Sequence, residues 1–278
     1  MPLGWRARER LRAAALLVAG TYVLVIGALW ATQTKMIFPV PVGELEEINT
    51  IGFADFGLVR TVAADGTVLH FYAAPARPNM PTVIMFHGNG SRSDFAARYL
   101  KFIQQAGYGL VLAEYRGYGG NPGTPSEAGL LRDARAQADW AQAHGEVGPP
   151  ILLGESIGSG VALDLAAERK VRALILDSPF TSLVDVMHRG LFWAVPGFLV
   201  GSPFFNLEKA PGIKVPVLVL SGQADGLTPP AQAARLTAAF PAARPLVSVP
   251  GVGHLVLAND RSKRADAAVL AFLGSLAP

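Results

Sequence analysis

The fold of this chain is decided by the stretch Ile151-Leu-Leu-Gly-Glu-Ser156-Ile-Gly158-Ser-Gly160. Its first residues form a short apolar run, which is typical of a buried strand, and an apolar helical pattern begins directly after Gly160. Small residues on both sides of Ser156 permit a tight turn from strand to helix, which leaves the serine hydroxyl exposed above the strand. The pattern Gly-x-Ser-x-Gly in this context predicts a nucleophilic serine.

The alternation of short apolar strands and longer helical patterns extends on both sides of this stretch. Strands are predicted at 82–86, 109–113, 151–153, 173–176, 217–220 and 246–249, and helices at 94–106, 127–144, 157–169, 229–240 and 262–275. Strands that are apolar throughout, with helices between them, indicate a mostly parallel sheet covered on both faces. Alternating runs at 57–63 and 67–73, joined by Asp65-Gly66, predict an antiparallel hairpin before that sheet. The expected fold class is α/β.

The N-terminal segment has the composition of a membrane anchor. Residues 13–34 contain no charge, and a helix of this length extends about 33 Å at roughly 1.5 Å per residue, enough to cross a hydrocarbon core. Four arginines precede it, so the positive-inside tendency places residues 1–12 in the cytoplasm and residues 35–278 outside it. The alternatives are a cleaved signal peptide, for which there is no convincing cleavage site, and a soluble helix, which would show a polar face. Residues 36–41, which contain two prolines, are expected to form an extended connector.

Composition and charge exclude several classes of protein. The 278 residues are 51% hydrophobic and 16% charged, which excludes a disordered chain. The absence of cysteine excludes disulfides, a thiolate nucleophile and cysteine-bound metals. Residues 1–35 hold five of the 24 basic and one of the 21 acidic residues, so the remainder has no cationic excess with which to bind nucleic acid. Because no metal-binding motif or dinucleotide fingerprint is present, neither a metal ion nor a cofactor is expected.

The partners that Ser156 needs are found at the ends of other predicted strands. A serine hydroxyl is a weak nucleophile until a base removes its proton. Five histidines are candidates: His70, His87, His144, His188 and His254. We favour His254, because it alone follows the last predicted strand. Asp177 and Asp225 both end core strands, and we favour Asp225 because its loop contains glycine, whereas Asp177 precedes a tight Ser-Pro turn and is expected to accept local backbone N–H bonds. The predicted triad is Ser156, Asp225 and His254.

Two backbone N–H groups are expected to bind the oxyanion that forms on a substrate carbonyl. Ile157 directly follows the nucleophile and supplies one of them. The other is expected in the sequence His87-Gly-Asn-Gly90, which follows the predicted strand 82–86, and we favour the N–H of Asn89. His87 is interpreted as a residue that braces this loop.

These motifs together resemble a known family. The matching stretches are Phe38-Pro39, His87-Gly-Asn-Gly90, Glu114-Tyr-Arg-Gly-Tyr-Gly119, Pro125-Ser-Glu127, Gly154-Glu-Ser-Ile-Gly158, Ser178-Pro-Phe-Thr-Ser182, Gly222-Gln-Ala-Asp225 and Gly253-His254. The chain resembles membrane-anchored α/β-hydrolase-domain proteins of the bud-emergence type, which are related to the serine aminopeptidase-like hydrolases. The resemblance implies an α/β-hydrolase fold and supports the predicted triad. It implies an esterase, lipase, thioesterase or peptidase without choosing among them, and a structural role for residues 114–119.

The leading hypothesis is a membrane-tethered serine hydrolase that cleaves an ester, thioester or amide through an acyl-enzyme intermediate. The alternative is a non-catalytic binding protein with the same fold, in which a triad residue would be expected to be missing. Residues 181–214 interrupt the alternation with apolar residues, glycines and prolines, and form either ordinary core packing or a small lid over a pocket. A lid and an anchor together predict a substrate with a hydrophobic acyl chain, met at the membrane.

Overall fold

In the part of the chain that the computed structural model describes, residues 5–45, 56–144, 147–189 and 195–276, eight strands form one sheet in the order β1-β2-β4-β3-β5-β6-β7-β8. The strands are β1 (Gly57–Val62), β2 (Val68–Ala74), β3 (Thr82–Phe86), β4 (Gly109–Ala113), β5 (Ile151–Glu155), β6 (Ala173–Asp177), β7 (Val217–Gly222) and β8 (Val247–Val249). Strands β3 to β8 are parallel, whereas β1 pairs antiparallel with β2, and β2 with β4. The carboxyl ends of the parallel strands therefore share one edge, where active sites of such sheets collect.

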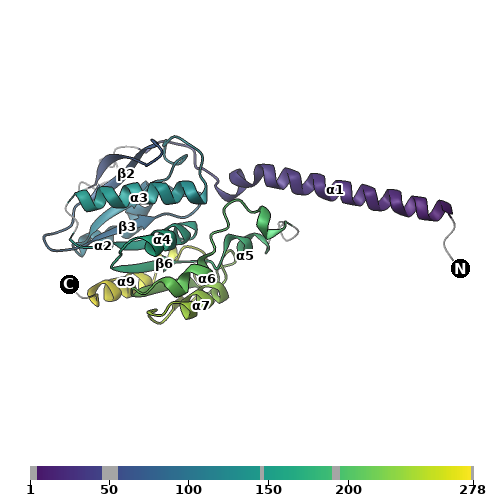
Figure 1. Ribbon diagram of the computed structural model, residues 1–278. Helices are drawn as coiled ribbons and strands as arrows, with labels where there is room; N and C mark the ends of the chain where they lie inside the picture. Colours follow the sequence, from purple (N-terminus) through teal and green to yellow (C-terminus); the bar gives the residue numbers. More distant parts are fainter. Residues whose placement is uncertain (1–4, 46–55, 145–146, 190–194, 277–278) are drawn as a thin grey trace.

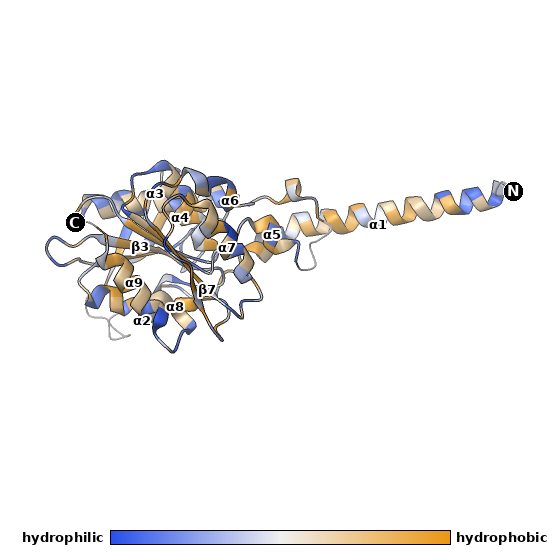
Figure 2. Cartoon of the chain, turned by 90° about the horizontal axis from the view of Figure 1, so that it is seen from below, coloured by the Kyte–Doolittle hydropathy of each residue, from blue (hydrophilic) through white to orange (hydrophobic). Residues whose placement is uncertain are grey.

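Helices cover both faces of the sheet (Figure 2). They are α2 (Ser93–Gln105), α3 (Glu127–Ala143), α4 (Ile157–Glu168), α5 (Leu183–Met187), α6 (Asn206–Lys209), α7 (Pro230–Ala239), α8 (Val256–Asn259) and α9 (Arg264–Gly274), with 3₁₀ turns η3 (Gly197–Leu199) and η4 (Ala210–Gly212). One apolar core lies beneath α3, α4 and α7, and a second lies beneath α2, α8 and α9. The structure confirms the α/β-hydrolase fold, with each predicted core strand and helix within two residues of its expected bounds.

The N-terminal helix α1 (Trp5–Ile37) is longer than the predicted span and projects away from the body (Figure 1). It continues through the arginines before residue 13 because Arg, Leu and Ala are strong helix formers. At its other end, Met36 and Ile37 form the last turn, so the prediction that they belong to an extended connector was wrong. Phe38 N–H still donates to Thr34 O at 2.9 Å, and Pro39 ends the helix. Within the described residues, α1 is the one helix long and apolar enough to cross a membrane.

Residues 181–214 divide into two parts with different surroundings. Phe204 is fully buried and packs edge-on against Phe180, and α6 lies on α4, so the second part is ordinary core packing. The first part, with α5 and η3, lies beside the end of α1 where that helix joins the body (Figures 1 and 2). Residues 190–194 of this segment lie outside the described residues.

Candidate active site

Ser156 lies at the turn from β5 to α4 in a backbone conformation that non-glycine residues rarely adopt. Its φ is 50° and its ψ is −119°, and its N–H donates to Asp177 O at 2.9 Å on the neighbouring strand. Strain of this kind persists only where the surrounding structure enforces it. A Cβ added to Gly154 would lie 2.4 Å from Gly158 O, and one added to Gly158 would lie 2.1 Å from Phe86 O. Both glycines of the motif are therefore sterically required to present Ser156.

The three predicted triad residues meet at the carboxyl edge of the sheet. His254 Nε2 lies 2.9 Å from Ser156 Oγ, and His254 Nδ1 lies 2.8 Å from Asp225 Oδ2. With a carboxylate opposite Nδ1, that nitrogen donates its hydrogen and Nε2 is left to accept the serine proton. The Ser156 and Asp225 side chains are buried, whereas the His254 side chain is 22% exposed. This geometry gives the serine a positioned base and an open face toward a substrate.

The Asp225 carboxylate is held by its own loop. Its Oδ1 accepts hydrogen bonds from Leu227 N–H at 2.9 Å and Thr228 N–H at 2.8 Å, and its Oδ2 accepts one from Thr228 Oγ1 at 2.8 Å in addition to His254. Burial acts to raise the pKa of Asp225, but the hydrogen bonds from His254 and Thr228 outweigh it, so the pKa is lowered below its usual value. Asp225 is therefore an anion at neutral pH and oriented toward the imidazole.

Backbone contacts bring the loops of Asp225 and His254 together. Ala224 N–H donates to Val252 O at 2.9 Å. A Cβ added to Gly222 would lie 2.2 Å from Gly253 O and 2.4 Å from Val252 O, so only glycine permits this approach. Gly222 is thus needed for the close approach of the loops that carry Asp225 and His254.

Asp177, the rejected candidate for the catalytic acid, supports the chain just after His254. Its carboxylate accepts hydrogen bonds from Val256 N–H at 2.9 Å and Leu257 N–H at 2.8 Å, at the start of α8, and from Ser178 Oγ at 2.9 Å. The prediction that its backbone partners would be local was wrong, because the two N–H groups lie about 80 residues further along the chain. No sequence pattern links these positions, since the contact depends on how the β8–α8 loop folds over the sheet.

The two predicted oxyanion donors flank Ser156. Asn89 and Ile157 line the same pocket as Ser156. Among the described residues, neither backbone N–H donates to another protein group, which leaves both available to a ligand. The Asn89 side chain is occupied in a different way: its Oδ1 accepts a hydrogen bond from Tyr118 Oη at 2.9 Å, and its Nδ2 donates to the carbonyl of Ile37, the last residue of α1. The loop that carries Asn89 is therefore bonded to the N-terminal helix.

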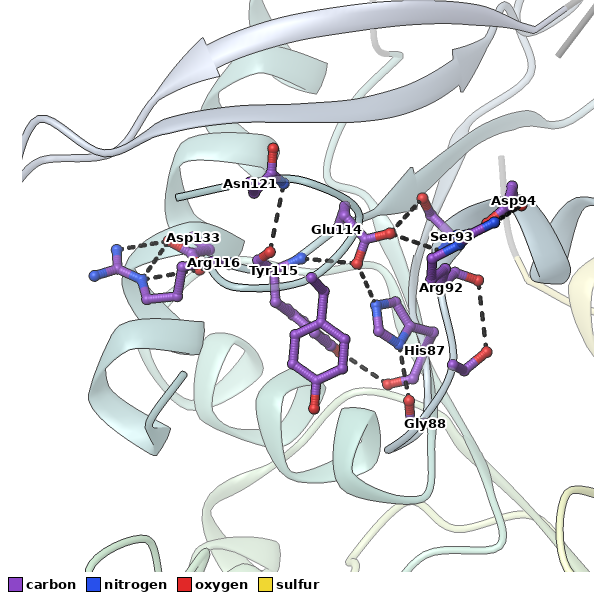
Figure 3. Close-up of polar contacts among 12 residues, drawn as sticks. His87, Gly88, Arg92, Ser93, Asp94, Glu114, Tyr115, Arg116, Asn121 and Asp133 are labelled. Atoms are coloured by element: carbon purple, nitrogen blue, oxygen red, sulfur yellow. Dashed lines mark hydrogen bonds and ion pairs between the residues drawn. The ribbon is translucent and has the colours of Figure 1, made fainter. Parts of the chain in front are cut away.

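A buried polar network fixes the other side of this loop (Figure 3). His87 Nε2 lies 2.7 Å from Glu114 Oε1 and its Nδ1 lies 2.8 Å from Gly88 O, with the His87 and Glu114 side chains both fully buried. Glu114 Oε2 accepts hydrogen bonds from Ser93 N–H at 3.0 Å and Ser93 Oγ at 2.9 Å, and Tyr115 Oη donates to His87 O at 3.0 Å. Both ring nitrogens of His87 are thus engaged away from Ser156, so its contacts are those of a structural brace rather than of a base.

The pocket beside Ser156, referred to below as the Ser156 pocket, has a volume of about 170 Å³. Met36 and Ile37 of α1 form part of its wall, and α5 contributes Leu183, Val186 and Met187. These side chains are apolar, and Ser156, Asn89 and Ile157 line the same pocket. The sequence analysis did not assign Met36 or Ile37 to the site, because they were expected in an extended connector.

Comparisons with known proteins agree with this geometry. A family model described as alpha/beta hydrolase fold matches residues 81–199, and another described as TAP-like protein matches residues 201–276. An uncharacterised protein of Mycobacterium tuberculosis is 34% identical over 234 residues, which cover 83% of each chain. The chain belongs to the α/β-hydrolase family. The resemblance found in the sequence is thereby confirmed at the level of this family.

Two further relatives have described activities. Lysophosphatidylserine lipase ABHD12 of Rattus norvegicus is 33% identical over 186 residues, which cover 60% of this chain and 47% of that protein, so this chain spans about half of its length. The esterase Pf2001 of Pyrococcus furiosus superposes with a TM-score of 0.71 at 20% identity, over 86% of this chain and 99% of that one, which shows a shared fold. The identity to the lipase supports a hydrolase activity for this α/β-hydrolase.

Proposed function

We propose that this protein is a membrane-tethered serine hydrolase that cleaves esters or thioesters with a hydrophobic acyl chain. The observation that carries the proposal is the hydrogen-bonded series from Ser156 Oγ to His254 at 2.9 Å and from His254 to Asp225 at 2.8 Å. The strained turn at Ser156 adds support, because strained residues cluster at functional sites.

In the proposed mechanism, Ser156 Oγ attacks the substrate carbonyl carbon while His254 Nε2 takes the serine proton. Asp225 stabilises the resulting imidazolium, and the N–H groups of Asn89 and Ile157 bind the oxyanion. The tetrahedral intermediate collapses, the bond to the alcohol or thiol breaks, and His254 protonates the leaving group. Water, activated by the same histidine, then hydrolyses the acyl-enzyme and restores Ser156.

The apolar wall of the Ser156 pocket supports the substrate class. Met36, Ile37 and the three apolar side chains of α5 offer a hydrophobic surface next to the nucleophile and no charged group for an acidic or basic acyl moiety. The lipase named among the relatives acts on a lysophospholipid, as its name states, which is consistent with a lipid-like ester. An amide substrate reacts through the same steps but requires protonation of a poorer leaving group. We therefore propose esters and thioesters, rather than amides, as the substrates.

The proposed topology is a single span with residues 1–12 in the cytoplasm, residues 13–34 in the membrane and the hydrolase domain outside the cytoplasm. Support comes from the arginines at the start of α1 and the uncharged run that follows them. Fusions of reporters after residue 45 test this arrangement. A reporter that functions only after export should be active, and activity of a reporter that functions only in the cytoplasm would refute the orientation.

Labelling with a fluorophosphonate tests the nucleophile in the full-length protein in detergent. The wild-type protein should be labelled covalently, and Ser156→Ala should not be labelled. Ser159→Ala is the matched control, because it removes the neighbouring serine of the same turn, and it should keep the label. A wild-type protein that is folded but neither labelled nor active on esters of two to sixteen acyl carbons would instead indicate a non-catalytic binding protein.

A further inference from the structure

The end of α1 does more than connect an anchor to the catalytic domain. Met36 and Ile37 lie in the wall of the Ser156 pocket, and the carbonyl of Ile37 accepts a hydrogen bond from the side chain of Asn89. We propose that this last turn of α1 is part of the acyl-binding site, and that a long acyl chain reaches Ser156 between α1 and α5 while its far end stays in the membrane. The inference rests on the proposed hydrolysis at Ser156 and adds where the acyl chain lies.

The size of the Ser156 pocket requires an exit for a long chain. Its volume is about 170 Å³, and an apolar cavity of about 150 Å³ accommodates one benzene molecule. The pocket therefore holds the reacting carbonyl and about the first six carbons of an acyl chain. The remaining carbons of a longer chain must leave between the two apolar walls, past Met36, whose side chain is 48% exposed at the surface.

The direction of α1 relative to the pocket is fixed by Gln33. The side-chain Nε2 of Gln33 donates to Leu199 O at 3.1 Å and to Trp30 O at 3.0 Å, and its Oε1 accepts from Gly201 N–H at 2.9 Å. Gln33 is buried, and Ile26 and Ile37 are buried on the same face of the helix at spacings of seven and four residues. A buried amide that is satisfied on both atoms holds the two segments in one register. The position of α1 against residues 199–201, and with it the place of Met36 and Ile37 in the pocket wall, is thus a built feature of the chain.

The exit from the pocket leads toward the proposed bilayer. Pro196 and Leu199 line a surface hollow together with α1 residues between Tyr22 and Trp30, and Phe198 beside them is 86% exposed. At about 1.5 Å per residue, Trp30 lies about 8 Å before Lys35, which marks the outer end of the uncharged run. In the proposed orientation, η3 therefore lies at the depth of the outer acyl chains. The exposed side chain of Phe198 is covered there by lipid, the same medium from which the acyl chain enters.

A larger side chain at Met36, which should block the proposed exit, tests the acyl-binding site independently of the catalytic centre. For full-length Met36→Trp in detergent, the ratio of kcat/KM for p-nitrophenyl palmitate to kcat/KM for p-nitrophenyl acetate should fall at least tenfold below the wild-type ratio. Val40→Trp is the matched control, since Val40 is 42% exposed, lies four residues further along and lines no part of the Ser156 pocket. It should leave both values unchanged. Gln33→Leu, which frees the helix from residues 199–201, should also reduce the preference for palmitate over acetate.

The outcomes distinguish this inference from the proposed function. Absence of fluorophosphonate labelling and of all ester hydrolysis in the wild-type protein refutes the proposed function itself. If the wild type is labelled but Met36→Trp loses equal activity on palmitate and acetate, or loses none on either, the inference is overturned. The proposed hydrolase function is unaffected by either result. A melting temperature of Met36→Trp equal to that of the wild type shows that a loss on palmitate is not due to unfolding.

Discussion

Replacement of Asp225 by asparagine should abolish most of the activity without changing the fold. Asparagine has the shape of aspartate, and its oxygen still accepts the N–H groups of Leu227 and Thr228 that contact Oδ1 in the wild type. The amide NH₂ then faces His254 Nδ1 at the position of Oδ2. Because NH₂ is a donor, His254 must turn an unprotonated Nδ1 toward it and carry its hydrogen on Nε2. In that tautomer the imidazole cannot accept the proton of Ser156.

The expected loss in kcat is on the order of 10⁴-fold, by analogy with the same change in a serine protease. At about 1.36 kcal/mol for each factor of ten, this corresponds to about 5.4 kcal/mol of lost transition-state stabilisation. The assay is the steady-state hydrolysis of a short-chain ester by full-length protein in detergent, with circular dichroism and a thermal melt to verify folding. Ser156→Ala gives the background rate against which the residual activity is read.

Asp177→Asn is the matched comparison, because Asp177 ends β6, Asp225 lies in the loop just after β7, and only Asp225 is hydrogen-bonded to His254. The Asp177 carboxylate accepts two backbone N–H groups and one hydroxyl, and asparagine must turn its NH₂ toward at least one of these donors. One unsatisfied buried group costs about 1–3 kcal/mol, which lowers the melting temperature by on the order of 2–12 °C for a domain of this size. Activity should remain within about tenfold. A folded, inactive Asp177→Asn beside a fully active Asp225→Asn would refute the assignment and make Asp177 the catalytic acid.

Three other changes have defined outcomes. Gly158→Ala places a Cβ 2.1 Å from a backbone carbonyl and should prevent folding, whereas Gly274→Ala, with nothing within 4 Å in α9, should leave the melting temperature unchanged or slightly higher. Burial raises the pKa of Glu155 well above its usual value, so its contribution to stability is complete below about pH 4.3 and is lost as the pH rises toward the folded-state pKa. The free energy of unfolding of the wild type in urea should therefore fall between pH 5 and 8, with up to about 1.4 kcal/mol per pH unit from this group. Glu155→Gln should reduce this slope but not remove it, because burial also raises the pKa of Asp177. Glu114→Gln removes the charged partner of His87 and should lower kcat on the order of 10- to 100-fold with little change in KM; an unchanged kcat would show that the brace is not needed to hold the oxyanion donors.

The features that the sequence predicts well depend on short-range patterns. The strands near Ile84 and Leu152 are apolar at every position because both of their faces are covered, and that composition is visible without a structure. Parallel strands align their carboxyl ends, so residues just after three different strands are expected to meet, and Ser156, Asp225 and His254 do so. A side chain at Gly154 would overlap the backbone of the following turn at Gly158, and one at Gly158 would overlap the end of β3 at Phe86.

The features that the sequence does not predict depend on contacts between distant segments. The partners of Asp177 follow from how the loop after β8 folds, and Gln33 is matched with Leu199 and Gly201 across more than 160 residues. In the sequence, Gln33 is one polar residue at the end of an apolar run, and nothing around it indicates that it binds another segment. The two prolines after residue 38 suggested an early start of extended chain, yet a proline restricts mainly the residue directly before it, so the helix continues through Ile37.

The contact between Asn89 and Ile37 joins a residue of a motif that is visible in the sequence to a distant segment that the sequence does not link to it. The last four carbonyl groups of a helix lack intrahelical donors, and the carbonyl of Ile37 is the final one of α1. It is satisfied by the side chain of Asn89, whose backbone N–H is the proposed oxyanion donor. Asn89 of the His-Gly-Asn motif thus caps the last carbonyl of α1 through its side chain and carries the proposed oxyanion donor on its backbone. A shift of α1 along its axis would move its terminal carbonyl and strain the loop that holds the oxyanion donor. The side chain of Asn89 therefore couples the position of the helix end to the geometry of the candidate active site.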